Sequence, residues 1–246
     1  MDLPQVLAAL QAEARENTAT IYRRHGAKGR VLGVSSSAIG KLVKRLGVDQ
    51  SLAEELWRTG IHEARVVATK IADAAAISTA ELERWVTESR DYITIDNVSG
   101  LAARTRGAQA LCRRWIGDPG EWKSAAGWNI LGWLVLEGRL DAAAAKPLLG
   151  RIEKGIHRAP NRTRYAMNGA LISIGGSLPG LTEAAVAAAQ RIGAVEVDHG
   201  QTGCKTPSAA GYIRKMAGHR AKRSRVTGTR MAAGRSQRKR APGPTG

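Results

Sequence analysis

Hydrophobic side chains recur every three to four residues along most of the chain, which is the spacing of one buried helix face. The pattern begins behind Pro4 with Val6 and Leu10, and Ile39 and Leu42 repeat it further along. We therefore predict helices almost from end to end. The predicted ranges are 4–25, 35–46, 51–59, 62–73, 78–86, 94–104, 106–116, 120–136, 141–155, 160–175, 181–192 and 207–217.

Capping residues and glycines indicate where several of these helices begin and end. Ser51 and Ser78 each stand three residues before a glutamate, which is the spacing of a capping box. Gly26 and Gly47 each follow a helical run and predict its stop. Pro147 lies inside the helix at 141–155, where its missing N–H should kink or restart the helix.

The helices are short and their connections are only a few residues long, as in helical repeat proteins. Alanine is abundant and runs of β-branched residues are rare, which favours helix over sheet. We predict an all-α fold in which antiparallel helix pairs stack into a curved α-solenoid. No strict repeat period is detectable, and an irregular helical bundle is the alternative.

The helical pattern stops after about Met216. Glycine, serine, threonine, arginine and lysine dominate the residues that follow, and Pro242 and Pro244 stand near the end. Like charges repel one another, and few apolar side chains are present to offset the entropy lost on ordering. We therefore predict one folded domain over residues 1–217 and a basic tail over residues 218–246 that is disordered when free.

The formal net charge of the 246-residue chain is +17, and most of it belongs to the C-terminal end. Asp198 is the last acidic residue, and 12 of the 38 lysines and arginines follow it. The other 26 face all 21 acidic residues, so residues 1–198 carry only +5. Lysine and arginine displace the counterions condensed on a phosphate polymer, so this excess indicates a nucleic acid partner. A solvated, non-specifically adhesive tail is the alternative. The predicted phosphate contacts of the tail are Arg220, Lys222, Arg223, Arg225, Arg238, Lys239 and Arg240.

Composition excludes several classes of protein. Hydrophobic residues make up 43% of the chain, which is enough for a core. No apolar run approaches the roughly 20 residues that cross a bilayer, and the N-terminal residues lack the order of a secretory signal, so we expect a cytoplasmic protein with no membrane partner. Cys112 and Cys204 have neither disulfide nor zinc spacing, and no P-loop, dinucleotide, HExxH or GxSxG motif occurs. We therefore expect no metal and no organic cofactor.

Tyr92 and Asp96 form a polar pair with a chemical use. They are four residues apart at the start of a predicted helix and can share one face. An aromatic ring attracts a cation through its π face, and a carboxylate beside it supplies the counter-charge. The pair therefore suits a cationic ligand. The alternative is an ordinary helix start, in which the aspartate caps the helix or the tyrosine packs.

Other charged residues in helical segments are candidate contacts in a groove. His62 and Arg65 are three residues apart and share a helix face, so both can line a groove. The alternative is a structural role, as a helix cap and a salt bridge between helices. Arg162 and Arg164 lie at a predicted helix N-terminus, where their charge opposes the helix dipole. This unfavourable placement of positive charge indicates that the two arginines bind phosphate at the helix N-terminus. The alternative is that they are simply solvated.

Three tryptophans lie on the predicted helix at 120–136. Trp122 and Trp133 are eleven residues apart, about three helical turns, so they can form one stripe, and Trp128 lies between them. Because the chain contains no phenylalanine, a tryptophan stripe in the core is the first interpretation. A platform on which bases stack is the alternative.

Several strings carry a resemblance to a known family. The most specific is Ile-His-Glu-Ala-Arg at 61–65, behind a helix with a tryptophan; the others lie at 33–35, 39–42, 56–60, 85–86, 92–96 and 168–175. In this order, over roughly residues 30–195, they resemble the DNA alkylation repair family of HEAT-like repeat proteins, the AlkD-like glycosylases. The segments 197–207 and 212–215 are similar to one branch of that family.

The resemblance implies a right-handed α-solenoid of HEAT-like helix pairs whose concave, basic face holds duplex DNA. It implies hydrolysis of the N-glycosidic bond of positively charged alkylated purines, such as 3-methyladenine and 7-methylguanine. A carboxylate near the sugar would stabilise the oxocarbenium character of the transition state. We expect a monomer associated with the nucleoid.

The resemblance also assigns roles to residues of this chain. Asp96 falls on the family's catalytic aspartate, and Tyr92 stands where the family usually has a tryptophan. Gly169 occupies the place of a second active-site tryptophan, and Lys123 is the nearest replacement for the cleft arginine. The further candidate contacts to DNA are His62, Arg65, Trp128, Arg162 and Arg164.

Two other functions remain open from the sequence. One is a non-catalytic HEAT-like scaffold that binds DNA or RNA and has lost glycosylase activity. The other is a helix-turn-helix regulator that uses residues 35–47, although it leaves most of the chain unexplained.

Overall fold

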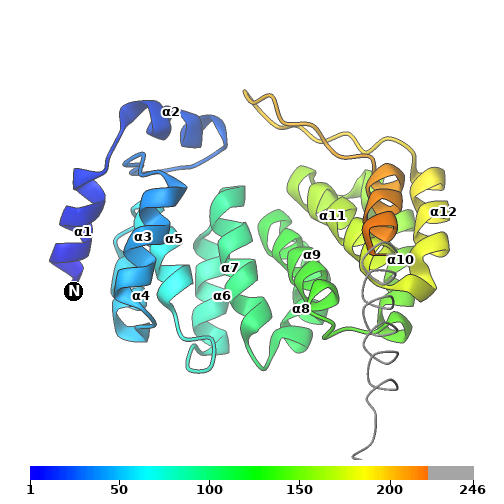
Figure 1. The fold of residues 1–246 in the computed structure, drawn as a ribbon, viewed down its shortest axis with the longest axis horizontal. Coiled ribbons are helices and arrows are strands. Elements are labelled where there is room, and N and C mark those ends of the chain that lie inside the picture. The colour runs from blue at the N-terminus through cyan, green and yellow to red at the C-terminus, as the bar shows by residue number, and fades with distance from the viewer. Residues whose placement is uncertain (221–246) are drawn as a thin grey trace, which may run out of the picture.

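A computed structural model describes residues 1–220 of the chain. These residues are helical and contain no strand (Figure 1). The tail contacts predicted at Lys222, Arg223, Arg225, Arg238, Lys239 and Arg240 lie outside the described residues.

The helices follow the hydrophobic pattern closely. They are α1 (Leu3–Ala12), α2 (Glu16–Arg24), α3 (Ser36–Leu46), α4 (Gln50–Arg58), α5 (His62–Ile71), α6 (Thr79–Glu88), α7 (Tyr92–Arg104), α8 (Ala108–Ile116), α9 (Glu121–Leu136), α10 (Ala142–Gly155), the 3₁₀ helix η1 (Ile156–Arg158), α11 (Asn161–Ser177), the 3₁₀ helix η2 (Pro179–Leu181) and α12 (Thr182–Ile192). A last helix covers residues 209–220. No single helix of this part is both long and apolar enough to cross a membrane, and α11 with η2 and α12 passes that test only as a pair bent by 116°.

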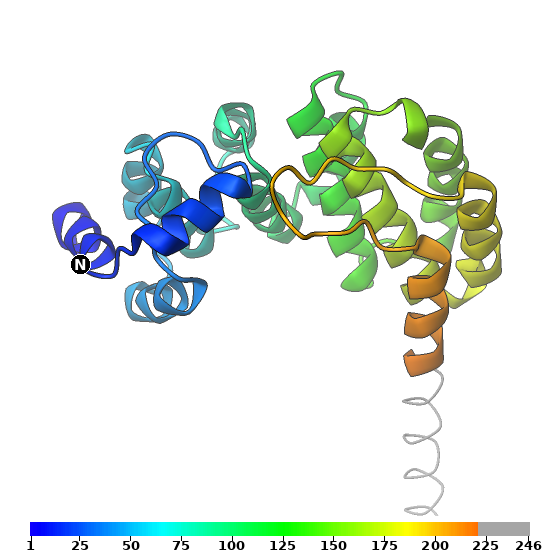
Figure 2. The same ribbon diagram turned by 90° about the horizontal axis from the view of Figure 1, so that it is seen from above.

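The helices stand side by side in a row and form two layers (Figure 1). α4 packs on α5 and α8 packs on α9, while α5, α7, α9 and α11 contact one another in succession and form the inner layer of the row (Figure 2). Seen from above, the row bends into an arc (Figure 2). This arrangement confirms the predicted all-α solenoid, since an irregular bundle would not stack its helices in chain order.

Tryptophans join neighbouring helix pairs in the core. The rings of Trp57 on α4 and Trp85 on α6 are fully buried and stack with their centroids 4.3 Å apart. Their indole N–H groups donate to Glu88 at 2.6 Å and to Glu81 at 2.8 Å, so the polar edge of each ring is satisfied. Such a ring pair adds about 0.5–1.5 kcal/mol beyond the apolar area that it removes from water.

The first predicted helix is interrupted. α1 ends at Ala12 and α2 begins at Glu16, with the Arg15 N–H donating to the carbonyl of Leu32 at 3.2 Å. A Cβ atom at Gly33 would lie 2.0 Å from the Arg15 carbonyl oxygen, so two backbones touch at this point. The break therefore comes from a tertiary contact between residues distant in sequence, which a local pattern does not contain.

One local prediction is wrong, and one is wrong in part. α4 begins at Gln50 because the Asp49 side chain accepts the Leu52 N–H, so Ser51 is not the capping residue. α10 continues through Pro147 without a break, so the helix does not restart there, which was one of the two predicted effects of the proline, a kink or a restart. The predicted cap at Ser78 is confirmed, since its hydroxyl accepts the Glu81 N–H at 3.0 Å.

The last helix extends beyond the predicted end of the folded domain. Residues 218–220, which the sequence places in a disordered tail, are helical, and Arg220 donates to the Thr182 hydroxyl at 3.2 Å and to the Gly176 carbonyl. The glycine pair at 175–176 lies inside α11, where the side chains of Ile213 and Met216 pack against it. Because these two glycines have no side chains, the last helix can pack closely against α11 at this point. The folded part therefore reaches at least residue 220.

Candidate functional site

Tyr92 and Asp96 lie one turn apart on the inner helix α7. The Asp91 side chain begins this helix by accepting the Thr94 N–H at 2.9 Å and the Thr94 hydroxyl at 2.7 Å. This double cap fixes the first turn, so both side chains point to the same side. They line a cavity of about 290 Å³ together, as their spacing predicts.

The cavity has walls from several parts of the chain. Its lining comes from the end of α2 (24–26), from α7 (91–96), from Trp122 on α9, from Arg162 and Tyr165 on α11, and from residues 198–204. The last of these belong to a segment, residues 193–208, that runs from α12 back over α11 toward α2 (Figure 2, gold). The cavity is therefore closed by residues from both ends of the folded part.

Polar contacts hold the 193–208 segment on α11. The Asn161 amide donates to the Asp198 carbonyl at 2.8 Å, and its oxygen accepts the Asp198 N–H at 2.7 Å. The Asn168 amide donates to the Pro207 carbonyl at 3.0 Å. These bonds anchor the segment at several points, so it forms a fixed wall of the site.

A guanidinium fills the aromatic part of the cavity. The Arg162 guanidinium carbon lies 4.5 Å from the ring centroid of Tyr92 and 4.8 Å from that of Tyr165. The Arg162 backbone N–H donates to Glu121 at 2.7 Å, which places the start of α11 against α9. The cation that the aromatic pair attracts is thus supplied by the protein itself.

Asp96 borders the same cavity with a perturbed carboxyl group. The Asn129 amide on α9 donates to it at 2.8 Å. The side chain is accessible to solvent, but protein surrounds the groove on most sides, and this reduced solvation raises the pKa of Asp96 to about 6. The charge of Arg162 and the Asn129 hydrogen bond act in the opposite direction on that pKa. At neutral pH the carboxylate is therefore mostly ionised.

Tyr92 also links the inner layer to α2. Its hydroxyl hydrogen-bonds the His25 Nδ1, and the two rings meet edge to face with centroids 5.6 Å apart. Burial raises the pKa of Tyr92 to about 12, so the hydroxyl stays protonated at neutral pH. The ring is therefore held on both sides, by His25 and by Arg162.

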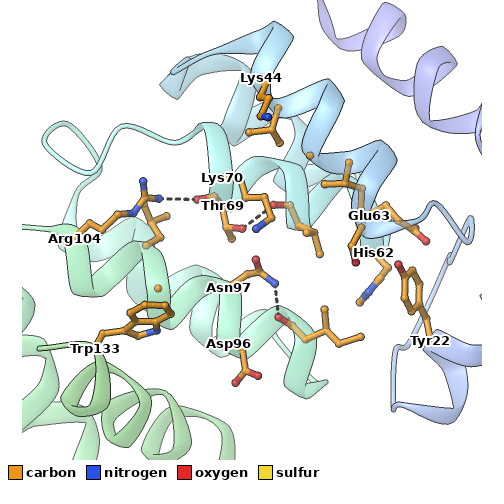
Figure 3. Close-up of a pocket in the computed structure, with 18 of the residues that line it drawn as sticks. Tyr22, Lys44, His62, Glu63, Thr69, Lys70, Asp96, Asn97, Arg104 and Trp133 are labelled. Atoms are coloured by element: carbon orange, nitrogen blue, oxygen red, sulfur yellow. Dashed lines mark hydrogen bonds between the residues drawn. The ribbon is translucent and has the colours of Figure 1, made fainter. Parts of the chain in front are cut away.

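A second, larger cavity of about 730 Å³ meets the first at Asp96 (Figure 3). Its walls are residues of α3, α5, α7 and α9 together with Tyr22 of α2, so it extends toward the N-terminal end of the arc. Lys44, Lys70 and Arg104 line it, and so does Trp133, whose side chain is 46% exposed. Asp96 thus separates an aromatic cavity from a cation-lined one.

Glu63, in the Ile-His-Glu-Ala-Arg sequence at 61–65, has a structural role. The Glu63 side chain is completely buried and accepts the N–H groups of Leu32 at 3.0 Å, Gly33 at 2.6 Å and Val34 at 3.3 Å. A buried carboxylate is stable when such donors surround it. Glu63 therefore fixes the loop before α3, although it also borders the larger cavity.

His62 and Arg65 are separated by the structure. His62 is buried beside the Tyr22 ring, with its Nδ1 3.8 Å from the Asp91 carboxylate, and it lines the larger cavity. Arg65 instead pairs with Glu88 of α6 at 3.1 Å and covers the Trp57 ring. The prediction that Arg65 faces the groove is wrong, and the salt bridge offered as its alternative is present.

Lys123 and Trp128 do not reach the groove either. The Lys123 amine pairs with Glu83 at 2.6 Å and with Asp118 at 3.3 Å, which directs it toward α6. Trp128 is 2% exposed and has no free ring face. Both predicted DNA contacts are corrected for the same reason, because these residues are turned toward the outer layer and the core.

Arg164 supports the fold of the site. Its guanidinium donates to the carbonyls of Glu196 at 2.8 Å, Ala159 at 3.1 Å and His157 at 3.2 Å. It is engaged with backbone oxygens and is not placed for phosphate. Gly169 is exposed, and a Cβ atom there would meet nothing within 4 Å, so no side chain fills the place of the second tryptophan.

Three members of the site were not predicted from the sequence. Asn129 and Tyr165 were not expected to contact the Asp96 and Tyr92 pair, and His25 was only the last residue of the first predicted helix. Each comes from a different helix, so no spacing along the chain connects it to α7. Among residues 1–220, no group of three or more histidine, cysteine, aspartate and glutamate side chains could hold a metal ion.

The comparisons with known proteins agree with this geometry. The model of a family described as "DNA alkylation repair enzyme" matches residues 6–213. Uncharacterized proteins of Listeria innocua and Listeria monocytogenes are each 28% identical over 218 residues, covering 86% of this chain and 95% of the relative. A solved structure described as "A new family of proteins related to the HEAT-like repeat DNA glycosylases with affinity for branched DNA structures" superposes with a TM-score of 0.81 at 32% identity, covering 87% of this chain and 93% of that one.

Proposed function

The chain belongs to the DNA alkylation repair enzyme family, and from this premise we propose that it binds DNA, branched DNA in particular, along its concave face without excising a base. The family and the fold support the binding. The contents of the small cavity support the absence of excision. The similar solved structure, described as having affinity for branched DNA, supports the choice of DNA form.

The position of Arg162 is the observation that carries the proposal. A cationic alkylated purine needs a free π face beside a carboxylate. Here the guanidinium lies over Tyr92 and Tyr165 and opposes a second positive charge at the same place. Since like charges in a groove repel strongly, the cavity selects against the base that the family excises.

The larger cavity supplies the phosphate contacts. Lys44, Lys70 and Arg104 line it, and within residues 1–220 none of the three has an ion pair with an acid. Each lies in the last turn of its helix, where the helix dipole favours a cation. These free charges suit a DNA backbone, because contacts to phosphate hold a protein on DNA regardless of sequence.

Binding is tested by fluorescence anisotropy with a labelled duplex and a three-way junction of equal arm length. We expect tighter binding of the junction, and weaker binding of both by a Lys44→Ala and Lys70→Ala double variant. The salt dependence of that variant should be flatter, by about 0.9 in the log–log slope for each phosphate that it no longer neutralises. Lys146→Ala, on α10 and outside both cavities, is the matched control. Equal affinity of the double variant and the wild type contradicts the proposed surface.

Excision of alkylated purines is the second candidate function. It is favoured by Asp96, which is accessible in the groove, held by Asn129 and mostly ionised at neutral pH. Such a carboxylate can stabilise the positive charge that develops on the sugar as the glycosidic bond breaks. This function requires the Arg162 side chain to leave the aromatic rings when DNA binds.

Release of 7-methylguanine and 3-methyladenine from methylated duplex DNA separates the two functions. The protein-free rate is the baseline, because these bases are also lost spontaneously. The proposal expects the wild type to match that baseline. Release above it by the wild type, and its loss in Asp96→Asn, overturns the proposal and establishes the second candidate. Arg162→Ala is measured beside them, since it vacates the aromatic rings while keeping Asp96.

A further inference from the structure

Trp133 differs from the other tryptophans of the chain. All six lie in the described part, and Trp133 alone is exposed, at 46%. The indole N–H groups of Trp57, Trp85 and Trp115 donate to glutamates. Those of Trp122, Trp128 and Trp133 have no acceptor within residues 1–220, and of these three only Trp133 is exposed. Packing in the core therefore does not explain why a tryptophan stands here. The first interpretation from the sequence, a tryptophan stripe in the core, does not hold for Trp133.

The ring borders the larger cavity where α9 meets α7. A Cβ atom at Gly100 of α7 would lie 3.8 Å from the Trp133 indole nitrogen, so the absence of a side chain there leaves the edge of the ring uncovered. Figure 3 shows Trp133 at the border of the cavity that Lys70 and Arg104 also line. An exposed aromatic ring inside a hollow is a surface on which a flat ligand can stack.

The rest of the cavity combines apolar lining residues with a positively charged end. The apolar lining residues are Ile39, Val43, Val66, Ile93 and Leu101. Arg104 uses one nitrogen to donate to the Thr69 carbonyl at 3.2 Å and keeps its remaining donors. Glu137, the acid nearest in sequence to Trp133, also lines the cavity, but it pairs with Arg139 at 3.3 Å. The other end is marked by the Asp96 carboxylate, which repels phosphate.

An exposed ring beside cationic side chains favours DNA with an unpaired base over a fully paired duplex. A base in a duplex is stacked on its neighbours and has no free face, whereas an unpaired base at a branch has one. The cavity of about 730 Å³ lies in the range of small-ligand pockets, which is suitable for one nucleotide and too small for a helix. We propose that it holds an unpaired nucleotide of branched DNA, with the base stacked on Trp133 and the phosphate bound by Lys70 and Arg104. This proposal rests on the proposed binding of branched DNA.

The test uses the full chain and three labelled DNAs: a fully paired duplex, a fork with an unpaired strand at the branch, and the same fork with an abasic nucleotide at the branch. The wild type should prefer the fork, and removal of the base should abolish that preference. Trp133→Ala should lose about 5- to 150-fold in affinity for the fork, the range that base stacking on an aromatic side chain gives, and should bind the duplex unchanged. Trp133→Tyr should restore part of the loss.

Leu136→Ala is the matched control, because Leu136 lies on the same helix, is 52% exposed and does not line the cavity. It should bind all three DNAs as the wild type does. As a direct readout of stacking, the unpaired nucleotide is replaced by 2-aminopurine, whose fluorescence is quenched on stacking. The wild type and Leu136→Ala should quench it, and Trp133→Ala should not.

The outcomes separate this proposal from the one on which it rests. If the wild type binds fork and duplex and Trp133→Ala binds both equally well, the nucleotide site is wrong and DNA binding stands. If the wild type binds neither DNA, the binding function itself fails and this site falls with it. A loss of fork and duplex binding to the same extent in Trp133→Ala also overturns the site, since it would mean a general contact and not one to an unpaired base.

Discussion

The guanidinium carbon of Arg162 lies 4.5 Å from the centroid of the Tyr92 ring. Arg162 is the second residue of α11 and Tyr92 is the first of α7, so the contact joins the first turns of two helices through residues that are 70 apart in the chain. It places a permanent positive charge against the ring that was predicted from the sequence to attract a cationic ligand. The electrostatics of the site therefore depend on Arg162 as much as on Asp96.

Removing the Arg162 charge should raise the pKa of Asp96. The guanidinium favours the ionised carboxylate, so Arg162→Ala should move that pKa above its wild-type value of about 6. Titration of ¹³C-labelled aspartate by NMR measures the change. Arg158→Ala, an exposed arginine that donates to the Lys154 carbonyl, is the control and should leave the titration unchanged.

Asp96 should make the stability of the protein depend on pH. Because its folded-state pKa is raised from 3.8 to about 6, the folded state binds this proton more tightly than the unfolded state does. Stability should fall as the pH rises from about 4 to about 6, and the loss should be complete above that range. Asp96→Asn removes this loss, so its Tm should exceed that of the wild type at pH 7 and approach it at pH 4.

Thermal denaturation at a series of pH values measures this difference. Glu55→Gln is the control, since Glu55 is exposed and has no ion pair within residues 1–220. Its Tm should follow the wild type at every pH. Parallel Tm curves for Asp96→Asn and the wild type would show that Asp96 titrates alike in the folded and unfolded states.

Glu63 should contribute strongly to stability. Glu63→Ala leaves the three N–H groups at residues 32–34 without an acceptor inside the protein. Each buried donor left unpaired costs about 1–3 kcal/mol, so the free energy of unfolding should fall by about 3 kcal/mol or more. Urea denaturation measures the loss. Glu55→Ala should change the midpoint little, and a similarly small change in Glu63→Ala would contradict the structural role.

Gly33 and Gly29 provide a matched pair for the backbone contact beside Glu63. Both have a positive φ, +81° and +72°, so alanine is strained at either position. At Gly33 the added Cβ would lie 2.0 Å from the Arg15 carbonyl oxygen, whereas at Gly29 the nearest atom is 3.8 Å away. Gly33→Ala should therefore destabilise clearly more than Gly29→Ala in urea denaturation. Equal losses would mean that the φ angle alone matters.

Residues 221–246 should contribute general affinity for DNA. They contain eight of the 38 lysines and arginines, and deleting them leaves Arg220, which contacts α11, in place. The deletion should weaken duplex binding and flatten its salt dependence by about 0.9 in slope for each phosphate that these residues neutralise in the full chain. A segment of the same length with serine at those positions should behave like the deletion. If it binds like the wild type, the charge of these residues is not used.

Much of the fold follows from local signals in the sequence. Ser78 and Gly47 begin and end helices where predicted, because a capping hydroxyl and a glycine with positive φ act on their own turn. The break between α1 and α2 was not predicted because it depends on the contact of Arg15 with residues 32–33, which are close only after folding. The last helix was predicted to stop at residue 217, at least three residues too early. Its extension depends on packing against the glycine pair in α11, which is again a contact between residues distant in sequence.

The candidate site was predicted in part. Tyr92 and Asp96 share a cavity because they are four apart on one helix, a relation that the sequence contains. Lys123, Trp128, Arg65 and Arg164 were placed wrongly because the direction of a side chain depends on which neighbour its helix packs against.

By itself, the sequence determined the all-α class, the helix order and the position of Asp96 one turn after Tyr92, because hydrophobic periodicity and capping act over a few residues. The tertiary structure alone decided that Arg162 occupies the aromatic rings, that Asn129 meets Asp96 and that Trp133 stands exposed above the larger cavity. These relations join α7, α9 and α11, and the packing of separate helices depends on contacts between residues distant in sequence, which no spacing along one helix encodes.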